Sequence, residues 1–598
     1  MPTRHSSRIH AGRRRYPFWR LVRANFYDFG LLLRESWIAL VAFAALALAG
    51  TLYLHYGHPA RLGFAAALFE TLKLVTLQTG LELPGDLLGE ALFFLIPLLG
   101  LALIFQSVLN FGRLLLDKSS RREAWQVALA STYRDHVIVA GLGRVGMRVV
   151  TQLLESGYAP VVIERDWSSP FVERALNLKV PVVVGDAREN TAPRQAGLAR
   201  ARAGVPTFDD DLANLEIALP ARAARPGIRV VLRVYGEELD QNLERGFGPN
   251  SAFSVSALAA PTYVAATVSR DVDYAMAVGG QLLGITALVI APESMLAGFV
   301  RAIEAQHSIR VLRHHSADGR HLGHTPMRRM GAGDQVLVLG TLPAIEGLRQ
   351  ANAANSKLAF LQPEQPQHPT DEHDTVIVCG LGKVGYRVVR QLAELAPRPR
   401  IVVVRRDDGR ADFAQRVSRI PGVRVLLGDA RDPEVLRAAG IERAYTVAAL
   451  TSDDLLNLQI GLAARRLRAD VHVVQRAFSD ALAQKLADMF GIRTVFSTSA
   501  LASATLAAAA VVGDITHAFA THGELFSTDE IVVRAGDTLD GRSVEAIRAQ
   551  HDGLVLALQR GGQAATLPAL DATLASGDVI TLLAPIEALA RVRVLLRR

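Results

Sequence analysis

Two long apolar runs near the N-terminus dominate the hydrophobic pattern of this 598-residue chain. The run from Ser36 to Leu54 and the run from Ala91 to Gly112 contain no Asp, Glu, Lys or Arg. As a helix that rises about 1.5 Å per residue, each is long enough to cross the roughly 30 Å hydrocarbon layer of a bilayer. The pattern therefore predicts two transmembrane helices that bracket residues 55–90.

The segment between the two predicted spans has an apolar stretch of its own. Phe64 to Leu77 has helical character but is too short to span a membrane, which is typical of a re-entrant or interfacial helix. We expect residues 78–84 to be non-helical, and such backbone is stable at membrane depth only where it lines a watery cavity or is buried in protein. The order helix, short helix, loop and helix predicts an α-helical pore.

Beyond residue 130 the pattern changes to short Val/Ile runs, each followed by glycine and an amphipathic helix, which is typical of parallel α/β units. This pattern occurs twice, since HVIVAGLGRVGMRVVTQL from His136 returns as TVIVCGLGKVGYRVVRQL from Thr375, about 240 residues later. We predict one Rossmann-like module in two copies, each closed by a smaller strand-and-helix unit. Two further motifs return in the same order: GDAR at 185–188 and 428–431, and DDLxNL at 210–215 and 453–458.

Each module begins with a glycine-rich turn that predicts a nucleotide site. Gly141, Gly143 and Gly146 follow a predicted strand and begin a predicted helix, and Glu164 ends the next strand about twenty residues later. Glycines allow the backbone to approach a phosphate, the helix N-terminus faces that phosphate, and the acid accepts hydrogen bonds from ribose hydroxyls. The first module is therefore expected to bind an adenine nucleotide.

The second module repeats the turn with Gly380, Gly382 and Gly385, but Arg405 stands where the first module has its acid. An arginine there suits a 2′-phosphate, or a ligand without the ribose contact. The two sites are expected to differ in ligand or occupancy, and either one is alternatively a purely structural turn.

The net charge of +8 comes from 66 Lys and Arg against 58 Asp and Glu, and its placement indicates a membrane flank rather than a nucleic-acid surface. Eight arginines precede the first apolar run, and four basic residues lie between 113 and 122, whereas the connecting segment has only Arg61 and Lys73. This bias predicts a multi-pass protein of the cell inner membrane with both termini cytoplasmic. The single cysteine, Cys379, excludes an intramolecular disulfide and provides no metal-binding spacing.

The predicted pore resembles that of two-transmembrane potassium channels. Residues 76–80 stand where that family has its filter signature, Thr-Val-Gly-Tyr-Gly. Thr76 and Gly80 agree, Leu77 is a mild change, and Gln78 and Thr79 replace a glycine and a tyrosine. The family's glycines let carbonyl groups point inward as ligands of the ion. The resemblance therefore implies a cation channel and leaves potassium selectivity open.

Four further residues extend the pore prediction. If four chains surround one pore, Glu82 and Asp86 would form carboxylate rings at its outer mouth, and the alternative is that both are solvated loop acids. Pro97 and Gly100 interrupt the second span, and either one is a candidate gating hinge. The alternative for Gly100 is close packing against a neighbouring helix. Glu70 and Lys73 are expected to form a local helix pair.

The repeated motifs resemble the regulator of potassium conductance (RCK) domain, also called TrkA-N, followed by a small α+β TrkA-C unit. The resemblance implies a homotetramer whose eight modules form a ring beneath the pore, with NAD or another adenine nucleotide (NADH, ATP or ADP) as ligand. It also places the aspartate of each GDA motif at the nucleotide cleft. The candidate nucleotide-binding residues are Gly141, Gly143, Arg144, Val145, Gly146, Glu164, Arg165, Asp186 and Ala187 in the first module, and Gly380, Gly382, Lys383, Val384, Gly385, Arg405, Asp429 and Ala430 in the second.

A divalent cation is left open as a second ligand. Asp209, Asp210 and Asp211 allow a calcium site, as in some relatives, but acids at a helix start are also ordinary N-caps. The metal-binding residues are therefore unknown from the sequence.

The predicted fold class is a membrane α-helical pore followed by two tandem Rossmann-like α/β modules, each with a small α+β unit. The expected segments are an N-terminal amphipathic segment at 1–35, the pore domain at 36–115, a linker at 116–135, the first N-lobe at 136–265 and its C-subdomain at 266–350, a linker at 351–373, the second N-lobe at 374–505 and its C-subdomain at 506–598.

Three functional classes fit these features. The first is a ligand-gated cation channel with lipid, permeant cations and an adenine nucleotide as its partners. The second is a membrane-anchored TrkA-type regulatory subunit of a separate transporter, which would need one helix and no re-entrant loop. The third is a nucleotide-dependent oxidoreductase, which the fold alone does not exclude. No His, Lys or Tyr placement suggests a catalytic site, so we expect a channel and not an enzyme.

Overall fold

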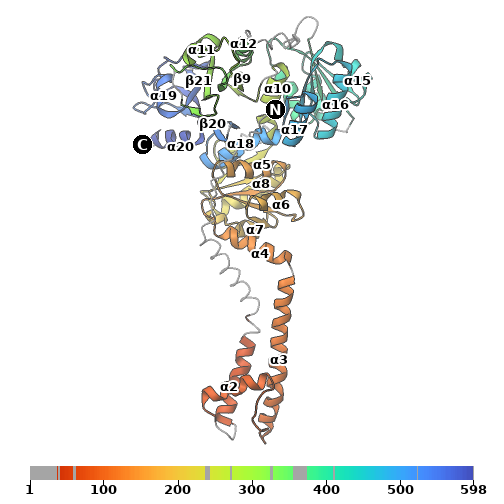
Figure 1. Cartoon of the computed structure of the whole chain (residues 1–598), viewed down its shortest axis with the longest axis vertical. Coiled ribbons are helices and arrows are strands. Elements are labelled where there is room, and N and C mark those ends of the chain that lie inside the picture. The colour runs from red at the N-terminus through yellow and green to blue at the C-terminus, as the bar shows by residue number, and fades with distance from the viewer. Residues whose placement is uncertain are drawn as a thin grey trace.

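The computed structural model describes residues 37, 41–57, 62–116, 118–235, 243–269, 272–323, 327–353, 374–407, 411–521 and 523–596. The chain is elongated, with apolar helices at one end and α/β layers at the other (Figure 1). The predicted N-terminal segment at 1–35 and most of the linker at 351–373 lie outside the described residues.

Three helices form the N-terminal part: Val41–Gly57, whose last turn is the π-helix η1 (Tyr53–Gly57), α2 (Phe64–Val75) and α3 (Leu87–Leu116). Among the residues with described placement, one helix, Leu87–Gln106, is long and apolar enough to cross a membrane, with a mean hydropathy of 2.4. Helix Val41–Gly57 is apolar but shorter, and the start of the predicted first span lies outside the described residues.

Glycines set the spacing of these three helices. A Cβ atom on Gly50 would lie 2.5 Å from the Thr71 side chain, and one on Gly100 would lie 2.8 Å from Val75, so both positions need glycine for the helices to approach. The contact at Gly100 is the close packing that the sequence allowed as an alternative to a hinge. Helix α3 continues through Pro97 and Gly100 without interruption, and the hinge itself stays a prediction.

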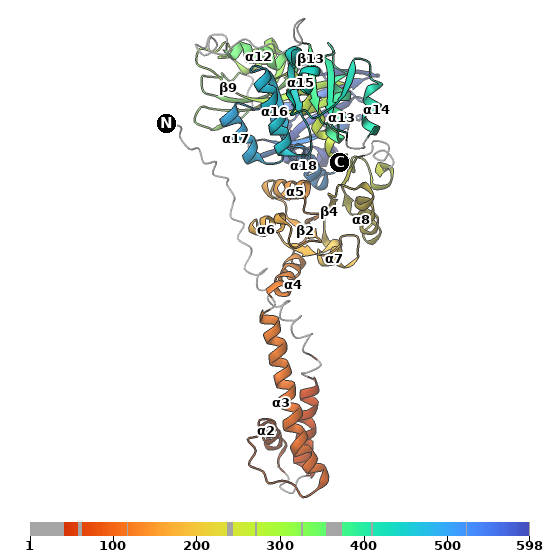
Figure 2. The same cartoon turned by 90° about the vertical axis from the view of Figure 1, so that its right-hand side faces the viewer.

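Helix α4 (Lys118–Ser131) joins α3 to the first α/β sheet. It packs against strand β3 (Val182–Val184), where the Gln126 side-chain oxygen accepts a hydrogen bond from the Val182 N–H at 3.2 Å. Ala128 and Ala130 of the same helix are fully buried. Helices α3 and α4 therefore lie one after the other between the apolar helices and the edge strand β3 of the sheet (Figure 2).

Each module has a parallel sheet with the strand order of a Rossmann-like fold. The first sheet has the order β3-β2-β1-β4-β5 and the second has β15-β14-β13-β16-β17-β18. Short, nearly continuous apolar strands form them because both faces are covered by helices. The remaining elements of the first module are β1 (Val137–Ala140), α5 (Arg144–Glu155), β2 (Pro160–Glu164), α6 (Pro170–Asn177), α7 (Thr191–Gln195), η2 (Leu198–Arg200), β4 (Ala203–Pro206), α8 (Asp211–Ala224) and β5 (Arg229–Val230), followed by the separate strand pair β6 (Leu232–Val234) and β7 (Ala252–Ser254).

The second module repeats this arrangement with one additional edge strand, β18. Its elements are β13 (Thr375–Cys379), α13 (Lys383–Leu392), β14 (Arg400–Arg405), α14 (Ala411–Ser418), β15 (Val423–Leu427), α15 (Pro433–Ala438), η4 (Ile441–Arg443), β16 (Ala444–Ala449), α16 (Asp454–Leu467), β17 (His472–Arg476), α17 (Asp480–Phe490) and β18 (Val495–Phe496).

The two small units are antiparallel sheets with equivalent strand orders, β11-β10-β12-β9-β8 and β22-β21-β23-β20-β19. They pack face to face, and the Phe519 ring stacks between Tyr274 and Phe526 at centroid distances of 5.1 and 5.2 Å. The first unit has β8 (Tyr274–Val278), β9 (Gln281–Val289), α11 (Val300–His307), β10 (Ile309–His315), β11 (His321–Leu322), β12 (Gln335–Thr341) and α12 (Leu342–Ala353); the second has β19 (Ala518–Thr521), β20 (Glu524–Val532), α19 (Val544–His551), β21 (Leu554–Arg560), β22 (Gln563–Thr566), β23 (Val579–Pro585) and α20 (Ile586–Leu596).

Two alanine-rich helices are exchanged between the halves. Helix α10 (Val255–Val268) leaves the first module and packs on α13 of the second, whereas α18 (Thr498–Val512) leaves the second module and packs on α5 of the first (Figures 1 and 2). Both helices are apolar on nearly all sides and are buried on nearly all sides. The boundaries expected after residues 265 and 505 fall inside these helices, because each helix belongs to the core of the other half.

Candidate functional site

Both glycine turns have the geometry of a nucleotide-binding turn. Gly141 and Gly380 have φ angles of +91° and +103°, which favour glycine. A Cβ atom on Gly146 would lie 2.0 Å from the Gly141 carbonyl oxygen, and one on Gly385 would lie 2.0 Å from that of Gly380. The close approach of α5 to β1, and of α13 to β13, therefore requires glycine in both modules.

In the first cleft, the Glu164 carboxylate lies against the glycine turn. It accepts hydrogen bonds from the backbone N–H of Leu142 at 2.6 Å, Arg165 at 2.8 Å and Asp166 at 3.1 Å. Strands β1 and β2 are adjacent and parallel, so this acid lies where the Rossmann-like fold places the ribose. The structure thus brings Glu164 and the turn together as the spacing predicted.

The GDA aspartates are each held by the arginine two residues later. Arg188 donates to both oxygens of Asp186, and this pairing lowers the pKa of the Asp186 carboxyl to about 2. Arg431 makes the same fork with Asp429, whose pKa is also lowered by that pairing. Each aspartate follows the end of a strand, β3 or β15, and its carboxylate is charged at neutral pH and able to accept hydrogen bonds.

Aromatic side chains border the first cleft. The Phe208 ring lies 3.1 Å from the place where a Gly141 Cβ would stand. From the second module, the Phe478 ring lies below the guanidinium groups of Arg144 and Arg148, at 5.1 and 5.6 Å, and the Phe478 carbonyl accepts a hydrogen bond from Arg148 at 3.1 Å. Residues of both modules therefore lie beside the start of α5.

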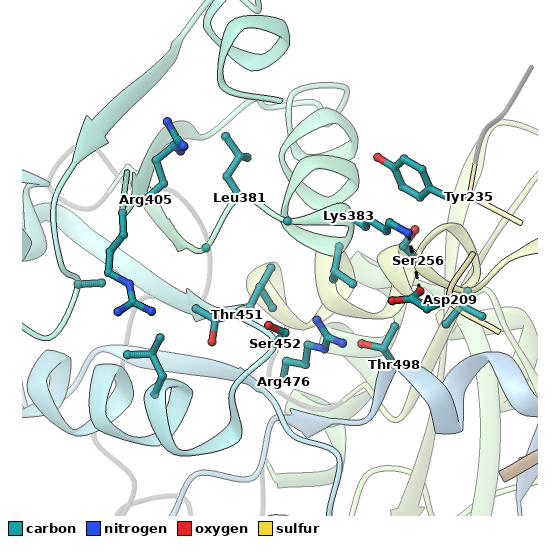
Figure 3. A pocket seen from close by; sticks show the side chains of 18 of the residues that line it. Asp209, Tyr235, Ser256, Leu381, Lys383, Arg405, Thr451, Ser452, Arg476 and Thr498 are labelled. Atoms are coloured by element: carbon teal, nitrogen blue, oxygen red, sulfur yellow. Dashed lines mark ion pairs between the residues drawn. The ribbon is translucent and has the colours of Figure 1, made fainter. Parts of the chain in front are cut away.

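The second cleft contains a cavity of about 640 Å³, a volume suited to a nucleotide (Figure 3). The predicted residues that line it are Gly380, Gly382, Lys383, Val384, Arg405, Asp429 and Ala430. Gly385 lies behind the turn, where it contacts the Gly380 carbonyl.

The first module supplies the opposite wall of this cavity. The Lys383 ammonium lies 3.7 Å from a carboxylate oxygen of Asp209 and 4.6 Å from the centre of the Tyr235 ring (Figure 3). Arg387 donates to the Tyr235 carbonyl at 3.0 Å and to the Ser256 hydroxyl at 3.1 Å. The sequence indicated Asp209 only as part of a possible calcium site, and it gave no signal that Tyr235 and Ser256 form this wall.

One helix-start aspartate in each module is an N-cap. The Asp210 carboxylate accepts from the Leu212 N–H and that of Asp453 from the Leu456 N–H, both at 3.0 Å, which confirms the capping alternative. Asp211 accepts from the Tyr235 N–H instead. Across the described parts of the chain, no group of three or more His, Cys, Asp or Glu side chains is arranged to hold a metal ion.

The filter candidates, Thr76 to Gly80, form a non-helical loop after α2. Leu77 has a φ angle of +59°, and the Gln78 N–H donates to the Lys73 carbonyl at 2.9 Å. Lys73 and Glu70 form the expected helix pair at 2.8 Å, which is confirmed, and the Thr79 hydroxyl donates to Glu70 at 3.2 Å. The ion pair between Glu70 and Lys73 is therefore also hydrogen-bonded to the loop, through Thr79.

Of the outer-mouth candidates, Asp86 has structural partners in this chain. It directly precedes α3 and accepts from the Gly89 N–H at 2.9 Å and from the Tyr53 hydroxyl at 2.6 Å. These bonds cap α3 and join it to the end of helix Val41–Gly57. Glu82 lies in the exposed loop between α2 and α3.

Family comparison agrees with this geometry. The TrkA-N domain model matches residues 137–255 and 376–498, and the TrkA-C domain model matches residues 530–597. The chain therefore belongs to the proteins with tandem TrkA-N (RCK) domains followed by a TrkA-C domain. The two TrkA-N matches end where α10 and α18 begin, so each RCK N-lobe ends at the first residue of its exchanged helix.

Curated relatives match parts of this tandem-RCK chain. Potassium channel protein 1 of Methanocaldococcus jannaschii is 24% identical over 208 residues, which are 34% of this chain and 61% of the relative. The Trk system potassium uptake protein TrkA homolog of Archaeoglobus fulgidus is 26% identical over 36% of this chain and 47% of its own length. The chain thus spans about half to three-fifths of these two relatives. TrkA of Mycobacterium tuberculosis is 26% identical over 36% of this chain and 94% of its own length.

Two solved structures share the fold over 95% of this chain. The GsuK channel bound to NAD aligns with a TM-score of 0.51 at 17% identity, over 95% of this chain and 99% of that chain. The structure described as the GsuK channel aligns with a TM-score of 0.52 at 16% identity over the same shares. At such identity the likeness concerns the fold alone.

Proposed function

We propose that this protein is a ligand-gated cation channel in which four chains surround one pore and their eight RCK modules form a cytoplasmic ring. The observation that carries this proposal is the packing of α2 and its following loop between helix Val41–Gly57 and α3. An anchor requires one helix, whereas a half-length helix followed by non-helical backbone is the arrangement of a pore loop, whose backbone lines a watery cavity or is buried in protein.

A change of shape on nucleotide binding would be transmitted from the first module to the pore through α4 and α3. A ligand shifts the ring between two shapes only by its difference in affinity for them, about 1–3 kcal/mol for each coupled site. Because Gln126 and the buried alanines of α4 hold the sheet edge, a displacement of the first module moves the end of α3.

Adenine nucleotides are the ligands that the two clefts suit, and NAD is the ligand in the name of one of the structures with this fold. We assign no chemical reaction to the protein, and the small units rather than a substrate domain follow each cleft. A divalent cation stays a prediction, as do location in the inner membrane and cytoplasmic termini.

Ion flux into liposomes that contain the purified full-length protein tests the proposal. We expect potassium and sodium fluxes that differ little, because Gln78 and Thr79 replace the glycine and tyrosine of the potassium filter, and we expect NAD to change both fluxes. Liposomes without protein provide the control. No flux of potassium, sodium or calcium, with or without nucleotide, would contradict the channel.

The alternative is a membrane-anchored regulatory subunit of a separate potassium transporter. The alignment to 94% of Mycobacterium tuberculosis TrkA favours it, because the name of that relative describes an uptake-system protein. The liposome measurement separates the two functions, since a regulatory subunit by itself conducts no ions.

Substituting Glu164 by alanine is expected to weaken NAD binding at the first module by at least about tenfold. A hydrogen bond to a charged group contributes about 1.5–3 kcal/mol, and alanine removes the carboxylate beside the glycine turn. Glu164→Gln keeps an acceptor and should lose less. Calorimetric titration of the full-length protein measures both, and unchanged affinity in Glu164→Ala would count against the assigned cleft.

A further inference from the structure

The two clefts differ in charge at equivalent positions. In the first module, Arg233 in β6 forms an ion pair with Asp209. In the second module, Arg476 at the end of β17 corresponds to Arg233, and Ser452 corresponds to Asp209. Arg476 lines the cavity near Ser452 (Figure 3), and no carboxylate of the described residues lies within ion-pair distance of it. The replacement of an acid by serine thus leaves a cationic group facing the cavity.

The second difference lies on the other side of the glycine turn. Arg405 and Arg406 line the cavity where β14 ends, next to β13, which leads into the turn. The Rossmann-like fold places the adenosine ribose at this strand end. In the first module Glu164 occupies the equivalent position. Its carboxylate accepts hydrogen bonds from ribose hydroxyls and repels a phosphate there.

Four acids line the second cavity: Asp407 directly follows the arginine pair, and the other three have partners as follows. Asp209 pairs with Arg233 and Lys383, Asp211 accepts from a backbone N–H, and Asp429 is held by Arg431, which lies outside the lining. The cationic lining residues are Arg233, Lys383, Arg405, Arg406 and Arg476. Because the strand order is β14-β13-β16-β17, these cations stand on both sides of the turn and suit a ligand with more than one phosphate group.

We propose that the second cleft binds an adenine dinucleotide whose ribose carries a 2′-phosphate, with Arg405 and Arg406 facing that phosphate. The first cleft, with Glu164, takes the ligand with a free ribose, so the two modules sense different nucleotides. A planar guanidinium group donates two parallel hydrogen bonds to a phosphate, so a pair of arginines forms a selective binding site for this group. This inference rests on the nucleotide-gated function proposed above and names the ligand class of one of its two sites.

Binding of 2′,5′-ADP and 5′-AMP to the full-length protein in detergent tests the proposal, because these probes differ only in the 2′-phosphate. We expect 2′,5′-ADP to bind at least tenfold more tightly, and NADP⁺ likewise to compete more strongly than NAD⁺ for the same site. Arg405→Glu, which copies the first module, is expected to abolish this preference. Equal affinities for the two probes, or a preference that survives Arg405→Glu, would overturn it.

Arg400→Glu is the matched control, since Arg400 begins the same strand, is exposed and does not line the cavity. It makes the same change of charge, and the preference should persist. A preference lost equally in both variants would overturn the assignment to Arg405. Melting temperatures of both variants show whether each is folded. Liposome flux that responds to NAD⁺ but shows no preference for NADP⁺ would refute this inference and leave the channel function standing.

Discussion

Replacing Arg548 by alanine is expected to lower the free energy of unfolding by about 3–5 kcal/mol, because it leaves a buried carboxylate without its counter-charge. Arg548 in α19 donates to both oxygens of Glu304 in α11, at 3.1 and 2.9 Å. The two side chains are 6% and 2% exposed. Glu304 also accepts from the Val311 N–H at 2.7 Å, a bond that holds the buried carboxylate in this place.

This ion pair joins the two small units, and a surface pair between the same two helices provides the control. Arg301 and Glu545 approach to 3.6 Å, but their side chains are 56% and 32% exposed. Arg301→Ala should therefore change stability by less than about 1 kcal/mol. Thermal unfolding of the full-length protein in detergent, followed by near-ultraviolet circular dichroism, compares the variants. Similar melting temperatures for Arg548→Ala and Arg301→Ala would contradict the prediction.

The double variant Arg548→Met with Glu304→Leu separates charge from packing. Replacing both partners of a buried ion pair with apolar residues of similar volume is often neutral or stabilising. We expect the double variant to recover most of the stability lost in Arg548→Ala. A double variant as unstable as the single one would show that packing rather than the unpaired carboxylate explains the loss.

Replacing Gly146 by alanine is expected to destabilise the first module by about 3 kcal/mol and to abolish nucleotide binding there. Its Cβ atom would stand 2.0 Å from the Gly141 carbonyl oxygen, and this oxygen belongs to the backbone of the turn. Helix α5 would have to move away from β1, and its N-terminus would leave the phosphate position. Thermal unfolding and NAD titration of the full-length protein measure the two effects.

Gly143→Ala is the control for stability, since its Cβ would meet no atom within 4 Å and its φ angle of −86° suits any residue. Its melting temperature should match that of the unaltered protein. A Gly146→Ala variant that melts at the unaltered temperature would mean that the approach of helix to strand is looser than the structure describes.

The order of the apolar helices, the two modules and the glycine turns could be predicted from the sequence because each depends on short-range patterns. A span needs an uncharged run, and a nucleotide turn needs glycines at fixed spacing before a helix. The same short-range patterns did not show that residues 265 and 505 lie inside helices that pack on the other half. Helices α10 and α18 are apolar on nearly all sides. Their sequences therefore contain no apolar stripe that would indicate which element they pack against.

The amino-acid sequence by itself determined the repeat, the glycine turns and the charge at each strand end. This includes the difference between Glu164 in the first module and Arg405 at the equivalent position of the second. Only the tertiary structure decided that the second cleft is closed by Asp209 and Tyr235 of the first module, and that Asp86 caps α3. The reason is physical: a strand-end charge depends on one residue, whereas a cavity wall depends on how the two halves dock. That docking is set by the exchanged helices, whose contacts lie more than 100 residues apart in the chain.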